Sequence, residues 1–224
     1  FLHFHRSIIA HGRILTIHVE KAREMPGVID IFTGKDLLED EVRPVPVNMP
    51  FTREDGSPAT SAPYFPLATD AVRFAGQAVA MVIAETAIQA EDAAECIEVD
   101  YEELPVLTSL TEAVKPDAPK IWEEISDNVA AAKTLGNQEE VDAVFRKAHH
   151  ITKLELVNPR LIGNPIEPRT SICEYDPESG RRTLHAGHQA PWRLKNGFAQ
   201  MFQEDPEMFR IVVRDIGGGF GTKT

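Results

Sequence analysis

The sequence predicts an α+β protein made of two domains joined by a linker. Three observations support this prediction. Residues 1–111 alternate short apolar runs with helix signals, residues 112–130 are acidic and rich in proline, and residues 131–224 combine a hairpin pattern with amphipathic helices and a glycine-rich end. At 224 residues, the chain is long enough for two modest domains with their own cores.

Strand signals open the first domain. Residues 1–4, 13–18 and 28–32 are rich in apolar and β-branched residues and predict strands. Residues 19–25 predict a short helical turn, and the Pro26-Gly27 pair that follows predicts a break. The segment 36–69 contains six prolines, so we expect an irregular excursion over the surface, with a turn at its Arg-Glu-Asp-Gly sequence.

A strand–helix–strand unit completes this domain. Residues 78–84 are continuously apolar, which is typical of a strand covered on both faces. Thr86 and Gln89 then form a capping-box signal for a helix. The apolar face of that helix consists of Ala90, Ala93, Ala94 and Ile97. Residues 98–102 predict the returning strand.

The second domain is predicted to begin with a helix that Asn137 and Glu140 cap. Its apolar stripe consists of Val141, Val144, Phe145 and Ala148. Residues 151–157 predict a strand, and residues 170–175 and 182–186 predict a hairpin.

A further helix is expected from Pro191, because proline is favoured in the first turn. Its predicted buried face consists of Leu194, Phe198, Met201 and Phe202. Residues 209–216 then predict a buried strand that leads into the glycine-rich end.

Composition excludes several classes of function. The formal charge of −12 and the pI near 5.1 oppose binding to nucleic acid or to an anionic membrane. The sequence contains no apolar run near 18 residues, so no membrane insertion is expected. Cys96 and Cys173 lack the spacing of a zinc or iron–sulfur site, and we expect both to be small buried apolar residues. Without a disulfide framework or signal peptide, a cytoplasmic location is expected.

The glycine-rich end, residues 217–224, predicts an anion site. Clustered glycines after a strand permit positive φ and let backbone N–H groups approach a ligand, and Lys223 adds a positive charge. Both nucleotide-binding fingerprints fail at Thr222, where each needs a glycine. A glycine turn without any ligand is the alternative interpretation.

Six short motifs, spread over nearly the whole chain, carry a resemblance to a known family. They are MPGV at residues 25–28, VRF at 72–74, IEVDYEELP at 97–105, IEPR at 166–169, QAP at 189–191 and DIGGGFGTK at 215–223. The first three resemble the hammerhead domain of the xanthine dehydrogenase and aldehyde oxidase family, and the others resemble the start of its molybdopterin-binding domain. The residues of these motifs are most similar to those of the carbon monoxide dehydrogenase-like large subunits.

This resemblance implies a hammerhead α/β domain at 1–111, a linker at 112–130 and the first part of a molybdopterin-binding α+β domain at 131–224. We expect the chain to be the N-terminal part of a large subunit, or a separately encoded part of one.

The resemblance also implies a set of site residues. The cofactor-binding residues would be Gln189, Gly218, Gly219, Phe220 and Gly221. In the family, the residue matching Gln189 hydrogen-bonds an oxo ligand of molybdenum through its amide, and the N–H of the residue matching Phe220 is a second donor. Neither ligates the metal directly.

Thr224 is expected close to the substrate. The purine-oxidising branch of the family has a carboxylate where Thr224 stands, so a purine substrate is disfavoured. The family's general-base glutamate lies downstream of the matching region. No catalytic residue is therefore expected in this chain, and the chain alone is expected to be inactive.

The implied enzyme is a molybdopterin-dependent oxidoreductase that hydroxylates an aldehyde, an N-heterocycle or a related small molecule with water as oxygen donor, or oxidises carbon monoxide. The implied cofactor is molybdenum-molybdopterin in its cytosine dinucleotide form. The implied partners are the remainder of the large subunit, an FAD-binding medium subunit and a small subunit with [2Fe-2S] clusters.

Two other functions stay open at this point. One is a non-catalytic assembly module of such a complex, and the other is a phosphate-loop nucleotide-binding protein. Glu167 and Arg169 lie between prolines, and we expect them to form an ion pair that packs the domains.

Overall fold

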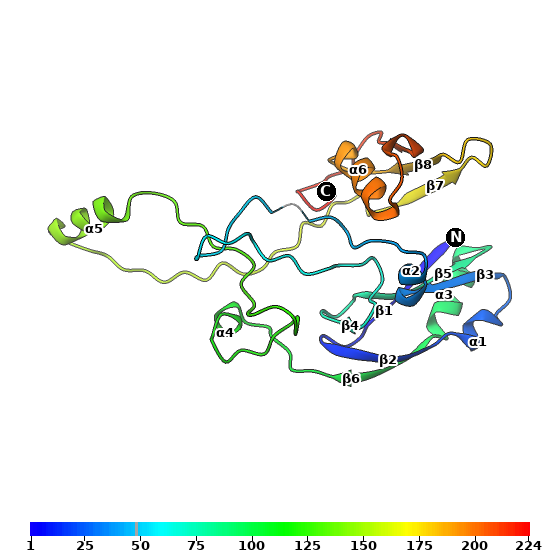
Figure 1. The fold of residues 1–224 in the computed structure, drawn as a ribbon, viewed down its shortest axis with the longest axis horizontal. Coiled ribbons are helices and arrows are strands. Elements are labelled where there is room, and N and C mark those ends of the chain that lie inside the picture. Colours follow the sequence, from blue (N-terminus) through cyan, green and yellow to red (C-terminus); the bar gives the residue numbers. More distant parts are fainter. Residues whose placement is uncertain (48) are drawn as a thin grey trace.

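The fold is described from a computed structural model, which describes residues 1–47 and 49–224. Figure 1 shows two folded bodies and an arm. The N-terminal body holds the elements from β1 to β6, the C-terminal body holds those from β7 to β9, and the arm carries α5 away from both. The predicted mixture of helices and sheets is confirmed.

Two three-stranded antiparallel sheets build the N-terminal body. The first has the order β1 (Leu2–Arg6), β5 (Ala78–Ala84) and β3 (Val28–Thr33). The second has the order β4 (Ala71–Val72), β2 (Gly12–His18) and β6 (Glu98–Glu103). The helices of this body are α1 (Glu20–Arg23), α2 (Gly34–Glu39) and α3 (Ala87–Glu95). Every strand predicted in this region is present.

The core of this body lies between β5 and α3. Strand β5 is largely buried on both faces, as its continuous apolar run predicted. Ala90, Ala93 and Ala94 of α3 are buried against it, together with Ile31 of β3. Small alanine side chains let the helix backbone lie close to the sheet, so the body gains a dense core from a short helix.

Helix α3 begins as the sequence predicted. The Thr86 hydroxyl accepts a hydrogen bond from the Gln89 N–H at 3.2 Å, and Gln89 Oε1 accepts one from the Thr86 N–H at 3.1 Å. This reciprocal capping box pairs two N–H groups that the helix itself cannot satisfy.

The irregular segments around residues 40–69 and 104–132 pack against each other. Arg53 pairs with Asp127 across them at 2.5 Å, and the guanidinium of Arg73 stacks on the Trp122 ring at 5.0 Å. Helix α4 (Leu110–Ala113) lies within the second of these segments. The chain between the two bodies is therefore held against the N-terminal body by specific contacts.

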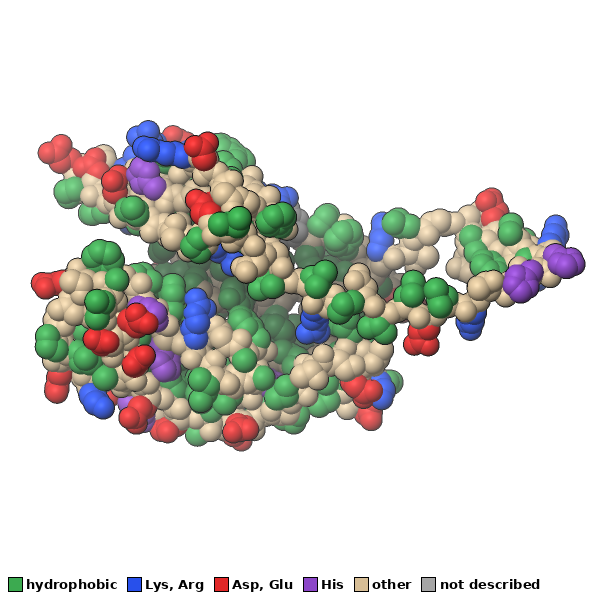
Figure 2. All heavy atoms as spheres, turned by 180° about the vertical axis from the view of Figure 1, so that it is seen from behind, with side chains coloured by type: hydrophobic (Ala, Val, Ile, Leu, Met, Phe, Trp, Pro, Cys, Tyr) green, Lys and Arg blue, Asp and Glu red, His purple; other side chains and the backbone are tan. Residues whose placement is uncertain are grey.

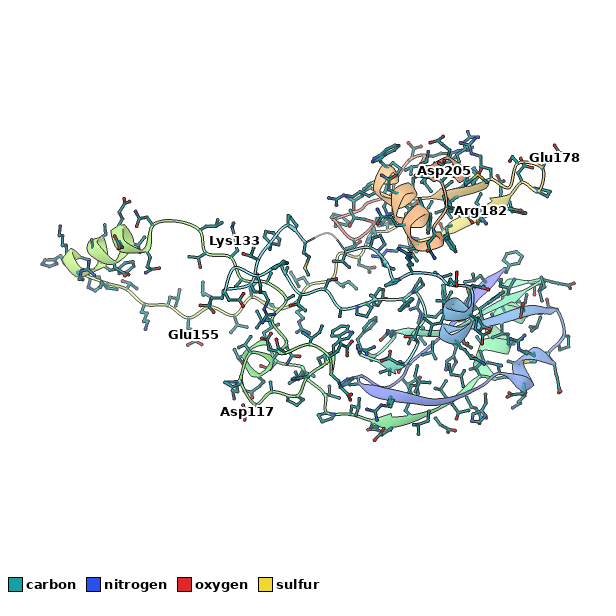
Figure 3. The ribbon with its side chains drawn as sticks, viewed as in Figure 1. Asp117, Lys133, Glu155, Glu178, Arg182 and Asp205 are labelled. Carbon is teal, nitrogen blue, oxygen red and sulfur yellow. The ribbon has the colours of Figure 1, made fainter. Side chains whose placement is uncertain are left out.

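The arm, residues 133–162, contains α5 (Gln138–Lys147) and two extended legs. Asn137 caps α5 through the Glu140 N–H, as predicted. Figure 3 shows Lys133 and Glu155 on the two legs, and Figure 2 shows the arm projecting from the rest of the molecule with apolar side chains along it. Its exposed large apolar residues are Leu135, Val141, Val144, Phe145, Ile151, Leu154, Leu156, Val157, Leu161 and Ile162.

The strand predicted at 151–157 is wrong. The structure describes all of these residues and gives them no strand hydrogen bonding. A run of β-favouring residues becomes a strand only when a neighbouring strand completes its hydrogen bonds, and this leg of the arm lies beside none.

The C-terminal body is a three-stranded sheet with one helix. β7 (Ser171–Tyr175) and β8 (Arg182–Ala186) form the predicted antiparallel hairpin, and β9 (Phe209–Val212) pairs with β8 in parallel. Helix α6 (Pro191–Phe202) starts at the predicted proline and is followed by η1 (Pro206–Met208). The rings of Phe198, Phe202 and Phe209 pack together between α6 and β9.

Three details of the structure differ from expectation. Strand β9 ends at Val212, four residues before the predicted end, and its last pairing with β8 is Val212 with His185. Phe202 is partly exposed, although a buried position was predicted. Cys173 is exposed on the edge strand β7, and Cys96 is only half-buried at the end of α3, so the prediction of two buried cysteines is wrong.

No helix in the described part of the chain combines the length and the apolar character that crossing a membrane requires.

Candidate functional site

Three segments that are distant in the sequence meet beside α6. They are the proline-rich link at 164–169, the turn between β8 and α6 at 187–190, and the glycine loop at 217–223. Backbone hydrogen bonds join the first and second segments to the third, from Glu167 N–H to the Gly217 carbonyl at 3.3 Å and from Gln189 N–H to the Lys223 carbonyl at 2.7 Å.

The Gln189 side chain lies directly over the glycine loop. A Cβ added at Gly219 would lie 2.5 Å from Gln189 Cδ, which is closer than any side chain tolerates. Gln189 Oε1 accepts a hydrogen bond from the Lys223 N–H at 3.3 Å. The structure therefore brings together Gln189 and the glycine loop, two features that the sequence placed about 30 residues apart.

The centre of the loop presents backbone N–H groups as free donors. Gly218, Phe220 and Gly221 have φ values of +96°, +50° and +77°. Among the residues that the structure describes, the N–H groups of Gly219, Phe220 and Gly221 have no acceptor. Successive N–H groups in left-handed backbone form a concave nest with a positive potential, which is suited to a negatively charged oxygen.

Phe220 is the non-glycine residue in this strained part of the loop. Its side chain is 76% exposed, so the ring does not hold the loop in place by burial. The left-handed conformation costs a residue with a Cβ about 1 kcal/mol or more. Strain of this kind persists where surrounding contacts fix the backbone, and the contacts on both sides of Phe220 do so here.

Those contacts come from an ion pair between Glu167 and Lys223. Lys223 Nζ lies 2.7 Å from Glu167 Oε2, and the Lys223 side chain is 1% exposed. The same Oε2 atom accepts the Gly217 N–H at 2.8 Å. The prediction that Glu167 pairs with Arg169 is therefore wrong, because Arg169 instead donates to the Thr222 carbonyl.

The ion pair also changes the expected role of Lys223. Its positive charge is balanced by Glu167 and is turned away from solvent, so the attraction for an anion comes from the backbone N–H groups. A phosphate-loop lysine needs a free ammonium group. The Lys223 ammonium is paired with Glu167, so the nucleotide-binding alternative is not supported by this geometry.

The pKa of Glu167 lies below its ordinary value of 4.5, first because Lys223 donates a hydrogen bond to the carboxylate and second because the Gly217 N–H does. A carboxyl group with a depressed pKa stabilises the folded state at pH above the ordinary value, and this stabilisation is lost as the pH falls through the depressed pKa. We therefore expect thermal stability to fall in acid partly through this group.

Thermal denaturation of the protein and of the Glu167→Gln variant, followed from about pH 6 downward, measures this effect. The variant cannot titrate at this position, so the difference in melting temperature between the two proteins should shrink as the pH falls. A difference that stays constant over the whole range would contradict this linkage.

His188 and Thr224 border the loop. Burial lowers the pKa of His188 and outweighs the opposing effect of the hydrogen bond between its Nδ1 and the Ala190 N–H at 3.0 Å, so the neutral ring predominates near pH 7. The Thr224 hydroxyl donates to the Gly221 carbonyl at 3.0 Å and is exposed at the end of the loop.

A separate hollow of about 300 Å³ lies between the two irregular segments of the N-terminal body. Its walls are mostly apolar and include Val47, Ile121 and Trp122. The acidic group in it, Asp127, is already paired with Arg53, and no residue of the glycine loop lines it. The loop, where free donors converge, is therefore the better candidate for chemistry.

In the described residues, no three His, Cys, Asp or Glu side chains are grouped closely enough to hold a metal ion. A metal at the glycine loop would therefore take its ligands from outside the described residues, for example from a bound organic group. The free amides and the Gln189 carboxamide fit the anionic oxygens of such a group, because neutral donors bind an anion without adding a titratable charge.

Sequence reasoning missed the role of the link at 164–169. Pro165 packs under the loop, so that a Cβ added at Gly218 would lie 3.0 Å from its Cβ. The sequence predicted an ion pair for Glu167 but with Arg169 as its partner. The true partner, Lys223, is 56 residues away, and a pair so far apart leaves no spacing signal in the sequence.

Two protein-family descriptions match the chain. "Aldehyde oxidase and xanthine dehydrogenase, a/b hammerhead domain" matches residues 1–105, and "Molybdopterin cofactor-binding domain" matches residues 121–224. Together they account for nearly all of the chain, with one match on each folded body.

Curated relatives and solved structures agree with these matches. The chain is 32% identical to the carbon monoxide dehydrogenase large chain of Afipia carboxidovorans, over 98% of this chain and 27% of that protein. It is 30% identical to the nicotine 6-hydroxylase large subunit of Paenarthrobacter nicotinovorans, over 98% of this chain and 26% of that protein. The chain thus spans about a quarter of the length of these relatives.

The chain superposes over 100% of its length on a crystal structure of the Cu,Mo-CO dehydrogenase and covers 28% of that chain. The TM-score is 0.83 and the sequence identity is 32%. Quinoline 2-oxidoreductase from Pseudomonas putida 86 superposes on 99%, with a TM-score of 0.86 and 28% identity.

Proposed function

This chain belongs to the xanthine dehydrogenase and aldehyde oxidase family, and on that premise we propose that it is the N-terminal part of a molybdenum hydroxylase large subunit. The complete protein would be a molybdopterin-dependent oxidoreductase that hydroxylates an aldehyde, an N-heterocycle or a related small molecule, or oxidises carbon monoxide. Water would supply the oxygen atom.

One observation carries this proposal: the carboxamide of Gln189 lies against a loop that offers three free N–H groups. The proposed cofactor-binding residues are Gln189, Gly218, Gly219, Phe220 and Gly221. The Gln189 amide and the N–H groups of the loop would bind the oxygen atoms of the molybdenum-molybdopterin cofactor. When bound, this cofactor supplies the two-electron oxidation chemistry of the reaction.

The residues of this chain would bind and orient rather than transfer protons. Gln189 does not titrate, the His188 ring is neutral, and the Glu167 carboxylate is occupied by Lys223 and Gly217. The general base would come from the remainder of the large subunit. Thr224, at the open end of the loop, would lie close to the substrate, and its hydroxyl in place of a carboxylate disfavours a purine.

The partners follow from the same proposal. The arm exposes a long run of apolar side chains, and surfaces of this kind are normally covered in the complete protein. We propose that the remainder of the large subunit covers the arm. An FAD-binding subunit and a [2Fe-2S] subunit would accept the electrons. The cofactor would be the cytosine dinucleotide form, and the complex would be cytoplasmic.

The Gln189→Ala variant of the complete large subunit tests the proposal. Removal of the carboxamide should lower turnover of an aldehyde or N-heterocycle substrate by about 100-fold, the usual effect of losing one positioned donor at a reacting centre. Molybdenum and pterin content, measured by elemental analysis and pterin fluorescence, should be high in the unmodified protein.

Gln200→Ala, on the exposed side of α6, is the matched control and should leave turnover unchanged. Well-folded complete protein without molybdenum or pterin would rule out the enzyme proposal. Unchanged turnover in the Gln189→Ala protein would favour the alternative of a non-catalytic assembly module.

A further inference from the structure

We propose that Glu167 and Lys223 act as positioning residues, a clamp that fixes the shape of the glycine loop and, through it, the position of Gln189. The purpose of the clamp rests on the proposed function above, but its existence rests on contacts within this chain. We use "the clamp" for the Glu167–Lys223 pair and its bonds to Gly217.

Glu167 holds both ends of the loop at once. At the start of the loop, Gly217 donates its N–H to Glu167 Oε2 at 2.8 Å and accepts the Glu167 N–H at 3.3 Å. At the end of the loop, the Lys223 ammonium donates to the same Oε2 at 2.7 Å. One carboxylate therefore closes a loop of seven residues, and closure of this kind restricts the backbone between its ends.

Lys223 carries this restriction to Gln189. Its backbone N–H donates to Gln189 Oε1, and its carbonyl accepts the Gln189 N–H at 2.7 Å. If the ammonium moved away from Glu167, the backbone that orients the Gln189 carboxamide would be released with it. Within residues 1–47 and 49–224 the ammonium has no other hydrogen-bond acceptor, so its buried charge depends on Glu167.

Glycines on two sides make room for the clamp. A Cβ at Gly187 would lie 3.2 Å from Glu167 Oε2 and 3.7 Å from Lys223 Nζ, and a Cβ at Gly217 would lie 2.5 Å from Glu167 Cβ. The pair therefore fills space that side chains at these positions would otherwise occupy, with the Lys223 side chain buried and the Glu167 side chain partly exposed.

The rival interpretation is that Lys223 binds the anionic ligand directly. The two interpretations predict opposite results for Glu167→Gln. In the rival case, removal of the carboxylate frees the ammonium and strengthens anion binding. With the clamp, Glu167→Gln and Lys223→Met both loosen the loop, so both variants speed hydrogen exchange in the loop.

Hydrogen exchange in the complete large subunit, followed by mass spectrometry on peptides covering residues 214–224, tests the clamp. Both variants should speed exchange of the loop amides that are hydrogen-bonded in the parent, those of Gly218, Thr222 and Lys223, by about tenfold, the ratio expected when one charge-assisted hydrogen bond that holds a segment is lost. Glu167→Gln is the safer variant for folding, because Glu167 is partly exposed and the glutamine keeps an oxygen that can accept the Gly217 N–H.

Glu204→Gln is the matched control. It removes the Arg182–Glu204 pair in the same body, where Arg182 lies on β8 (Figure 3), and it should leave exchange of the loop unchanged. Unchanged exchange in both Glu167→Gln and Lys223→Met would overturn the clamp, as would slower exchange in Glu167→Gln together with tighter anion binding.

A second measurement separates positioning from general stability. In cofactor-loaded protein, Glu167→Gln should alter the electron paramagnetic resonance spectrum of Mo(V) in the same direction as Gln189→Ala and should lower kcat with KM unchanged, whereas Glu204→Gln should do neither. A spectrum and kcat equal to those of unmodified protein would overturn the positioning role. If unmodified protein contained no molybdenum, the proposed function would fail, while the exchange comparison would still decide whether the clamp exists.

Discussion

Gly219→Ala should reduce turnover by the proposed complete hydroxylase by about 100-fold, because displacement of a positioning group by about 1 Å has an effect of this size. The added Cβ would lie 2.5 Å from Gln189 Cδ and 2.8 Å from its Nε2, so the carboxamide must move away from the loop. The loop N–H groups and the Gln189 amide could then no longer face the same ligand. Steady-state kinetics, together with molybdenum content, would measure the loss.

Gly197→Ala is the matched control for this substitution. Gly197 lies within α6, and a Cβ there would meet Pro46 Cγ at 3.7 Å, an ordinary contact. Alanine is also the better helix former, so this variant should be as stable as the parent or slightly more stable. Full turnover in Gly219→Ala would show that the position of Gln189 against the loop does not matter for the reaction.

Ile31→Ala should lower the free energy of unfolding of the N-terminal body by about 3 kcal/mol, the middle of the range for a large buried aliphatic side chain. Ile31 is 1% exposed in β3 and belongs to the cluster formed with Val82, Ala93 and Ile97. The surrounding strands and α3 cannot collapse fully into the space left behind. Urea denaturation followed by circular dichroism would measure the shift of the midpoint.

The neighbouring isoleucine on the same strand provides the control. Ile29 is 65% exposed, so Ile29→Ala removes the same atoms from a site in contact with solvent. Its effect on the free energy of unfolding should stay below about 0.5 kcal/mol. Equal effects of the two substitutions would show that the core does not lie between β3, β5 and α3.

Local signals in the sequence predicted most elements correctly. The capping box at Thr86 and Gln89, the apolar run of β5 and the proline at the start of α6 each act within a few residues. Physical effects of such short range are recorded in neighbouring residues, and the structure confirms all three. The resemblance to the family was likewise carried by short contiguous motifs.

Predictions that needed a distant partner were less successful. Residues 151–157 have the composition of a strand, but no strand lies beside them to pair with. The edge position of Cys173 depends on which side of the sheet β9 joins, and β9 pairs with β8 rather than with β7. Such outcomes depend on the whole arrangement of the sheet, so no nearby residue indicates them.

The sequence by itself determined the family, most of the regular elements and the glycine-rich character of residues 217–221, because short motifs and local geometry suffice for these. The tertiary structure alone decided that Glu167 pairs with Lys223 and not with Arg169, and that Gln189 lies on Gly219. Contacts between residues 30 to 56 positions apart depend on how the link, the turn and the loop fold back on one another. The free energy of forming such contacts includes the closure of the chain between them, so it depends on the folded arrangement and not on any one segment.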